Sequence, residues 1–470
     1  MEDKKTAPAE NTSLTQANPV AALAPAAPRE GFAGPVPPAA AVPGNATGAG
    51  DVPQSAVQPQ QQRDPFMVPP PQLPTQQGPH GVLYDFNDGA RVCLPQGGQW
   101  HVSIEDAESG NILFACDADG GWVVSTKKYY VPFNIKVWRR GEQTPLVDHT
   151  MNLEGKEVIV KFPIGTLGDI VGWMHYVERF RQKYKCVVEL IIQKELAEIF
   201  APQYPQIFFT SPPMPAAPGS PVPPFTTRFT KPYATYKVGL FFRGNLDDQP
   251  VDFRQVGLHR TAGYILGVDP KEEAPHINLN YPRAIKEPYV CIATKSSCQA
   301  KLWNNGAGWE IVVKHLKDMG YRVICIDREA VVGHNFVWNR MPHDAEDFTG
   351  NKPFAERIAL MQHAEFFIGL SSGLSWLAWC AKIPIVMISG FTLPICEFET
   401  PYRVYSSHGC KGCWDDVNCN FDHHDFFWCP RHKGTDRQYE CSRLITGKQV
   451  VGHIDRLMKD YKLLPPNKRK

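Results

Sequence analysis

The sequence lacks the features that would place it with membrane or nucleic-acid-binding proteins. It has no run of about 18 apolar residues, so we expect no membrane-spanning helix. No apolar stretch follows the charged residues 2–5, as a secretory signal would require. Lys and Arg number 49 against 48 Asp and Glu, so no excess of positive charge favours nucleic acid as a partner.

The 13 cysteines are odd in number, and several lie inside apolar runs, as Cys186, Cys291 and Cys325 do. Such a set fits a reducing compartment better than a disulfide framework. We therefore expect a cytoplasmic protein. Its 470 residues are too many for one hydrophobic core, so more than one folded unit is expected.

Composition divides the chain. Residues 1–78 are rich in Pro, Ala, Gly and Gln and show no hydrophobic periodicity, which predicts a disordered tail. Residues 79–155 hold short strand-like runs at 82–86, 90–94, 101–104, 111–114 and 133–138, separated by Gly-containing turns. They predict a small all-β barrel or sandwich.

Strand and helix patterns alternate from residue 156 onward, which predicts two Rossmann-like α/β halves over 156–285 and 286–405. A Pro-rich insert at 211–232 interrupts the first half. A cysteine-rich segment at 406–445 and a final helix and tail at 446–470 complete the chain. Ligands bind where the strand carboxyl ends of such halves face each other.

The first candidate site is the loop 162–169, where a strand ends, two glycines turn the chain and a helix begins. Asp169 lies at the mouth of the expected cleft. A carboxylate there can accept the proton of an acceptor hydroxyl as its oxygen attacks a sugar carbon. The alternative is that Asp169 serves only as a helix N-cap.

The second candidate is the Gly/Ser run 369–376, which follows a strand and opens a helix. Helix N-terminal amides and the hydroxyls of Ser371, Ser372 and Ser375 suit a diphosphate. The run lacks the Gly-Lys-Ser/Thr ending of a Walker loop, and an ordinary capped turn is the alternative.

Residues 294–301 follow a strand of the second half. Lys301 can place a positive charge on a departing phosphate, with Lys295 as the alternative. Asp327, at the end of the strand 322–327, is a further candidate for binding the nucleotide sugar. A solvated surface lysine is the alternative for this segment.

Cys410 and Cys413 form a C-x-x-C pair, followed by Cys419, Cys429 and Cys441. Two thiolates at this spacing bind one metal ion, and two later cysteines complete a tetrahedron. The segment has few aliphatic residues, so we expect a structural metal. Zinc is the default, and iron fits a four-thiolate site equally well. The alternative is that these are redox cysteines or a chance cluster.

Together these features resemble the bacterial autotransporter heptosyltransferase family. The resemblance covers about residues 80–465 and rests on the β-rich unit, the loop 165–169, Thr294 with Lys301, the run 369–376 and the cysteine cluster. The two loops also resemble the wider ADP-heptose:lipopolysaccharide heptosyltransferases, from which the β-rich unit and the cysteines separate this chain.

The resemblance implies an α/β protein of the GT-B class, with two Rossmann-like halves preceded by the all-β unit and the tail. It implies transfer of heptose from ADP-heptose to serine hydroxyls of autotransporter adhesin passengers in bacteria. Asp169 would be the base, and direct displacement would invert the anomeric centre without a catalytic metal. The candidate residues for binding substrate and nucleotide are Gly165, Thr166, Leu167, Gly168, Thr294, Lys301, Asp327, Ser371, Ser372, Gly373, Leu374 and Ser375.

The resemblance also implies an iron ion held by Cys410, Cys413, Cys429 and Cys441, and a large ring-shaped homo-oligomer. Two rivals remain open. A lipopolysaccharide core heptosyltransferase would need a basic or amphipathic membrane-facing patch, which the sequence does not show. A non-enzymatic module with a nucleic-acid-binding metal knuckle would use the aromatic residues near the cysteines, but the flanking charges are mixed.

Overall fold

The structure is a computed structural model that describes residues 68–129, 131–163, 165–213, 223, 225–242 and 247–469. Most of the predicted tail and part of the insert 211–232 lie outside the described residues. Residues 68–78, assigned to the tail by composition, are ordered. Gln76–Gln77 form strand β1, which pairs antiparallel with β2 (Leu83–Asn87), and the N–H of Thr75 donates to Asp85.

The first α/β half is built on four parallel strands in the order β11-β10-β9-β12. They are β9 (Glu157–Lys161), β10 (Val187–Ile191), β11 (Ile207–Thr210) and β12 (Ala234–Lys237). The helices are α1 (Leu167–Tyr184), α2 (Lys194–Phe200), α3 (Phe253–Val256) and α4 (Arg260–Ile265). Strand β12 begins and ends earlier than the predicted run 236–242, whose last residues leave the sheet toward the cleft.

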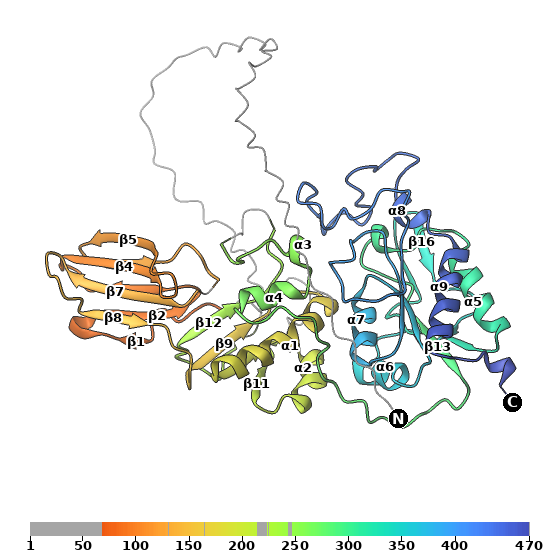
Figure 1. Ribbon diagram of the computed structural model, residues 1–470, viewed down its shortest axis with the longest axis horizontal. Coiled ribbons are helices and arrows are strands. Elements are labelled where there is room, and N and C mark those ends of the chain that lie inside the picture. The colour runs from red at the N-terminus through yellow and green to blue at the C-terminus, as the bar shows by residue number, and fades with distance from the viewer. Residues whose placement is uncertain are drawn as a thin grey trace, which may run out of the picture. The chain divides into compact units, whose positions relative to one another are not determined.

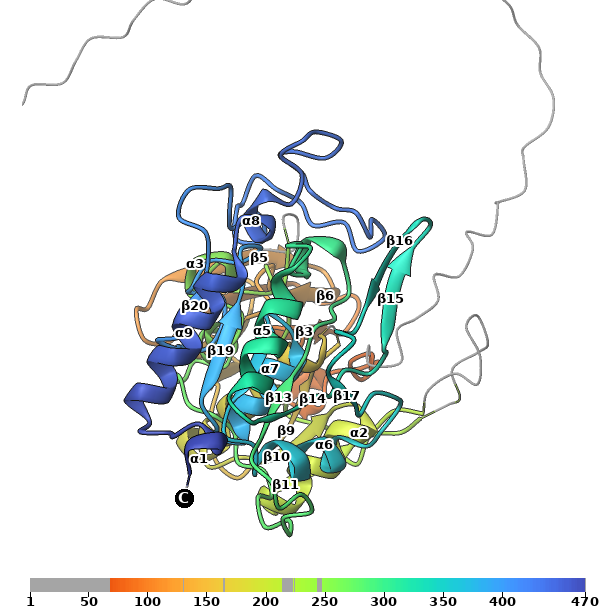
Figure 2. The same cartoon turned by 90° about the vertical axis from the view of Figure 1, so that its right-hand side faces the viewer.

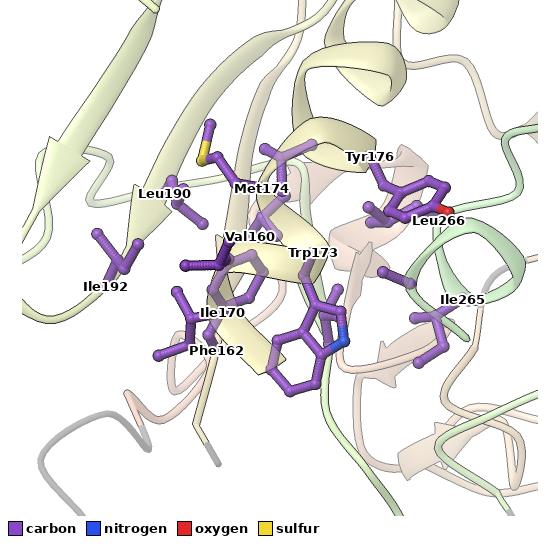
Figure 3. Close-up of a cluster of buried hydrophobic side chains, with 14 of the residues drawn as sticks. Val160, Phe162, Ile170, Trp173, Met174, Tyr176, Leu190, Ile192, Ile265 and Leu266 are labelled. Atoms are coloured by element: carbon purple, nitrogen blue, oxygen red, sulfur yellow. The ribbon is translucent and has the colours of Figure 1, made fainter. Parts of the chain in front are cut away.

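Helix α1 packs between the strands and α4. Figure 3 shows Ile170 and Met174 on the side of Val160 and Leu190, while Tyr176 lies toward α4. These side chains are almost completely buried. At about 25 cal/mol per Å² of apolar surface removed from water, such burial is the main force that holds α1 in place. The helix thereby fixes the position of the loop that precedes it.

The β-rich region shares a sheet with the first half. Strands β2, β3 (Arg91–Leu94) and β6 (Gly121–Val124) continue the sheet of the first half, because β2 pairs parallel with β12. A second, antiparallel sheet has the order β5-β4-β7-β8 and is drawn in orange in Figure 1. Its strands are β4 (Trp100–Asp106), β5 (Ile112–Ala118), β7 (Phe133–Arg139) and β8 (Val147–Thr150).

The second half is a parallel six-stranded sheet in the order β17-β14-β13-β18-β19-β20. Its strands are β13 (Tyr289–Ile292), β14 (Arg322–Cys325), β17 (Glu346–Asp347), β18 (Phe367–Leu370), β19 (Ile385–Ile388) and β20 (Arg403–Val404). Alternate strand residues feed two cores, because successive side chains point to opposite faces. Helices therefore cover both faces of the sheet.

Helices α5 (Gly308–Asp318) and α9 (Gly447–Asp460) pack together on one face, as Figure 2 shows. Helices α6 (Phe354–Met361) and α7 (Gly373–Cys380) cover the other face of the sheet. The hairpin of β15 (Val331–His334) and β16 (Val337–Arg340) was not predicted. Residues 405–439 form turns without a helix or strand, and the short helix α8 (Glu440–Arg443) follows.

Each half has the strand order of a doubly wound sheet. Numbered along the chain, the strands run 3-2-1-4 in the first half and 3-2-1-4-5-6 in the second. The order reverses between β9 and β12, and again between β13 and β18. Loops that leave the sheet at such a point diverge and create a crevice for a ligand. Among the helices of the described residues, none has the length and apolar character needed to cross a bilayer.

Candidate active site and metal centre

A cavity of about 290 Å³ is lined by loops from both crevices. From the first half come the loop after β9 and residues after β12; from the second come the loops after β13, β18 and β19. The predicted residues in its lining are Gly165, Thr166, Gly168, Asp169, Lys301, Ser371, Ser372 and Gly373. The structure thus brings together three loops that are far apart in the sequence.

Asp169 both faces this cavity and caps helix α1. The backbone N–H of Thr166 donates to its Oδ2 at 2.6 Å, within a capping box in which Thr166, not Asp169, is the N-cap. The side chain is nearly buried, with 7% of the residue exposed. Burial raises the pKa of Asp169 above its usual range, while the Thr166 N–H and the charge of Lys301 oppose the rise.

Lys301 lies in a box of aromatic rings. Its Nζ is 5.2 Å from the ring centroid of Trp414, 5.3 Å from that of Phe391 and 5.7 Å from that of Phe421. Cation–π contacts of this kind contribute about 0.5–2 kcal/mol. The rings hold the ammonium group without neutralising it, so its charge remains available to a ligand. The alternative, Lys295, is buried outside the cavity lining.

The Gly/Ser run opens α7, whose N-terminus lies against that of α1. Ser371, Ser372 and Gly373 line the cavity, whereas the buried Ser375 hydroxyl donates to the carbonyl of Leu370. A Cβ on Gly373 would lie 2.7 Å from Leu167, and one on Gly168 would lie 2.7 Å from the ring of Trp376. Both glycines are therefore required for the close approach of the two helices. Leu167 and Leu374 do not line the cavity.

Thr294 and Asp327 do not line the cavity either. The buried Asp327 carboxylate accepts hydrogen bonds from the N–H and hydroxyl of Thr294, at 2.7 and 2.9 Å, and from the N–H of Lys295 at 3.2 Å. Burial raises the pKa of Asp327, and these donors oppose the rise. The two predicted residues thus join the ends of β13 and β14 and shape the loop that carries Lys301.

The cysteine-rich segment contributes a wall of the cavity, which the sequence did not reveal. Trp414, Phe421 and His423 all line it. The His423 ring lies 4.7 Å from that of Phe421 and 6.3 Å from that of Phe242 in the first half. Burial, and then the nearby charge of Lys301, lowers the pKa of His423. The segment therefore contacts both halves at the site.

A second cavity, of about 20 Å³, is lined by all four predicted metal ligands, Cys410, Cys413, Cys429 and Cys441. A space of this size holds about one small ion or water. Cys419 is not in its lining and instead contacts Asp416. Burial raises the pKa of Cys441 to about 12, and the charges of Cys410 and Cys429 add to the rise. A bound cation would offset this mutual repulsion of the thiolates.

Cys410 also has a ring nitrogen of His432 and a carboxylate oxygen of Glu440 nearby, all within 4.8 Å of one another. Glu440 is already engaged: it accepts from the N–H of Cys410 at 2.8 Å and from two nitrogens of Arg437. These bonds, led by those from Arg437, lower its pKa to about 2. A carboxylate so occupied is suited to orienting the Cys410 loop. Among the described residues this is the one group of three potential ligands that comes so close together, and it shares only Cys410 with the predicted set.

Two protein families match parts of the chain. The family described as "Glycosyltransferase TibC, N-terminal domain" matches residues 78–141, and "Glycosyltransferase family 9 (heptosyltransferase)" matches residues 256–405. The autotransporter heptosyltransferase BAHTCr of Citrobacter rodentium strain ICC168 is 60% identical over 392 residues, which are 83% of this chain and 93% of that protein. The chain belongs to the autotransporter heptosyltransferase family.

TibC of Escherichia coli O78:H11 strain H10407, another member, is 58% identical over 84% of this chain and 94% of that protein. A crystal structure of TibC, described as iron-containing and dodecameric, superposes with a TM-score of 0.79 and covers 84% of this chain and 100% of that one. Another TibC structure is a complex with ADP-D-beta-D-heptose. These relatives confirm the GT-B class and the heptosyltransferase enzyme class of this chain.

A more distant member, BimC of Burkholderia thailandensis, is named an inactive autotransporter heptosyltransferase. It is 38% identical over 389 residues, which are 81% of this chain and 87% of that protein. Besides the wall from the cysteine-rich segment, sequence reasoning missed Thr392 and Glu397, which also line the cavity. A glutamate within the largely apolar stretch 391–398 was the one available signal.

Proposed function

We propose that this member of the autotransporter heptosyltransferase family transfers heptose from ADP-heptose to serine hydroxyls of an autotransporter adhesin passenger, with inversion at the anomeric carbon. The observation that carries the proposal is the convergence of Asp169 and Lys301 on one cavity from the two halves. The TibC complex with ADP-D-beta-D-heptose supports the donor. The names of the relatives support an autotransporter acceptor.

In the proposed reaction the serine oxygen attacks the anomeric carbon as the bond from that carbon to the diphosphate oxygen breaks. ADP leaves with the bonding electrons, and the serine proton passes to Oδ1 of Asp169. The carboxylate is suited to this task because burial raises its pKa while Thr166 holds Oδ2 in place. A single displacement of this kind inverts the anomeric centre.

The negative charge that develops on the departing ADP needs stabilisation. Lys301 and the amides at the start of α7 supply it, and a fixed donor of this kind contributes a factor of about 10²–10³ to the rate. Gly165, Thr166 and Gly168 bring backbone close to the acceptor side, and Thr294 and Asp327 hold the lysine loop. Leu167 packs against Gly373 where α1 meets α7, Ser375 closes the turn from β18 into α7, and Leu374 packs against the core.

We assign an iron ion to Cys410, Cys413, Cys429 and Cys441, by analogy with TibC, which is described as iron-containing. The ion would supply a cross-link in a segment that has no helix or strand between residues 405 and 439. The segment's own residues complete the cavity wall. By the same analogy the chain forms a large homo-oligomer, and its 13 unpaired cysteines favour the cytoplasm.

The decisive experiment incubates the purified protein and ADP-heptose with an adhesin passenger, or separately with a lipopolysaccharide core acceptor. Mass spectrometry of the passenger should show whole heptose additions that map to serines. Transfer to the core acceptor alone would establish the lipopolysaccharide rival instead. Transfer to neither would refute the proposal. The anomeric configuration of the product, determined by NMR, tests inversion.

A further inference from the structure

One wall of the cavity carries a cluster of hydrogen-bonded side chains that the proposed chemistry does not yet use. Ser371 follows β18, Thr392 and Glu397 follow β19, and Arg403 begins β20. The first three line the cavity, and the arginine lies behind them. Glu397 is 2% exposed and Thr392 is 5% exposed, whereas Ser371 is half-buried. Ser371 is therefore the member that a ligand can reach.

The carboxylate of Glu397 sets the direction of every hydrogen bond in the cluster. It can only accept, so the hydroxyls of Ser371 and Thr392 both donate to its Oε1. Its Oε2 accepts from Nη1 of Arg403 at 2.5 Å. Nη2 of the same guanidinium donates to the carbonyl and hydroxyl oxygens of Thr392, at 3.1 and 3.2 Å. The buried ion pair therefore fixes the carboxylate in place.

The consequence is that Ser371 has no proton left for a ligand. The hydroxyl oxygen of Thr392 is saturated by Glu397, Arg403 and Ser389, the last at 2.7 Å. The Thr392 hydroxyl also lies 3.3 Å from the Ser371 oxygen, but its proton is directed to Glu397. The oxygen of Ser371 therefore presents lone pairs to the cavity, with the carboxylate of Glu397 behind it. Phosphate oxygens at neutral pH carry negative charge and need donors, so this wall repels them. Sugar hydroxyls are donors, and this wall accepts them.

We infer that Ser371, positioned by Glu397 and Arg403, binds hydroxyl groups of the transferred sugar and is not part of the diphosphate subsite. The inference rests on the proposed function and deepens it, because it divides the cavity. The diphosphate is left to Lys301 and the amides of α7. The sugar lies against the wall between β18 and β20, whose exposed oxygen accepts hydrogen bonds. Ser371 thus has a different role from the one that the Gly/Ser run suggested.

Calorimetric titration with ADP-heptose and, separately, with ADP tests this division. Ser371→Ala should weaken ADP-heptose binding about 10- to 100-fold, the usual range for losing a hydrogen bond in a charged network, and should leave ADP binding unchanged. Glu397→Gln should have the same selective effect, because the amide NH₂ would donate to the Ser371 oxygen and so reverse the direction of the hydrogen bond between the two side chains. Ser389→Ala, which touches only the back of the cluster, is the control and should change neither affinity.

An equal loss of ADP and ADP-heptose binding in Ser371→Ala would return the serine to the diphosphate subsite and overturn the inference. Unchanged binding of both would overturn it as well. The Glu397→Gln variant weakens a buried ion pair and can lose its fold, but Ser371→Ala keeps that pair and so decides the matter alone. If the unaltered protein bound no ADP-heptose, the failure would lie with the proposed function.

Discussion

Asp169→Asn separates the two roles of this side chain. The amide oxygen of asparagine can still accept from the N–H of Thr166, so the capping box that starts α1 is kept. The amide cannot take up the proton of a serine hydroxyl. General-base catalysis contributes a factor of about 10²–10⁴, so kcat should fall by about that factor, which corresponds to about 3–5 kcal/mol in the barrier.

The stability of the same variant should not fall. Burial raises the pKa of Asp169 in the folded state, so the folded protein binds this proton more tightly than the unfolded chain does. At pH values above both pKa values the ionised carboxylate therefore costs stability, by about 1.4 kcal/mol for each unit of the shift. A neutral amide removes this cost. We expect the free energy of unfolding of Asp169→Asn to equal or exceed that of the unaltered protein.

A matched control comes from α9, which begins with a second capping box between Thr446 and Gln449. Neither residue lines the cavity. Thr446→Ala should lose about 1 kcal/mol of stability and no transfer activity. The assays are single-turnover heptose transfer, denaturant unfolding and calorimetric ADP-heptose binding, which should be unchanged in both variants. Transfer at the normal rate by folded Asp169→Asn would refute the role of this carboxylate.

Three further predictions concern pH, the lysine and the metal. Because burial raises the pKa of Asp169 above its ordinary 3.8, kcat/KM should fall as the pH drops through a midpoint above 3.8; a flat acid limb would contradict this. Lys301→Met should lower kcat about 10²–10³-fold, whereas Lys295→Met, outside the cavity, should leave kcat near normal; the reverse order would exchange their roles. Cys413→Ser should lose the metal, as measured by elemental analysis, and should have a lower Tm. Cys419→Ser should keep the metal content and the Tm of the unaltered protein; equal metal content in the two variants would exclude the proposed ligand set.

Much of the fold follows from local patterns. Apolar runs predict β9, β10, β13, β14, β18 and β19 because parallel strands are buried on both faces. The convergence of Asp169 and Lys301 follows from their places after β9 and β13, since the carboxyl ends of these strands face one cleft. The spacing and thiolate chemistry predict that Cys410 and Cys413 share a site with later cysteines, whereas the choice of Cys429 and Cys441 rests on the family resemblance; all four line one cavity.

The rest depends on tertiary contacts that no local pattern encodes. The pairing of β2 with β12 joins residues about 150 positions apart, so the β-rich region appears separate in the sequence. The wall formed by Trp414, Phe421 and His423 belongs to a segment whose sequence indicates only a metal site. Asp327 stands at a strand end, as ligand-binding acids do, but three donors from residues 294 and 295 engage it in the structure.

The most direct test of the account is an experimental structure of the protein with intact ADP-heptose. We expect the diphosphate beside Lys301 and the start of α7, and the anomeric carbon open to a hydroxyl held by Asp169. A donor bound with its anomeric carbon facing away from Asp169, or outside the cavity between the two halves, would contradict the account.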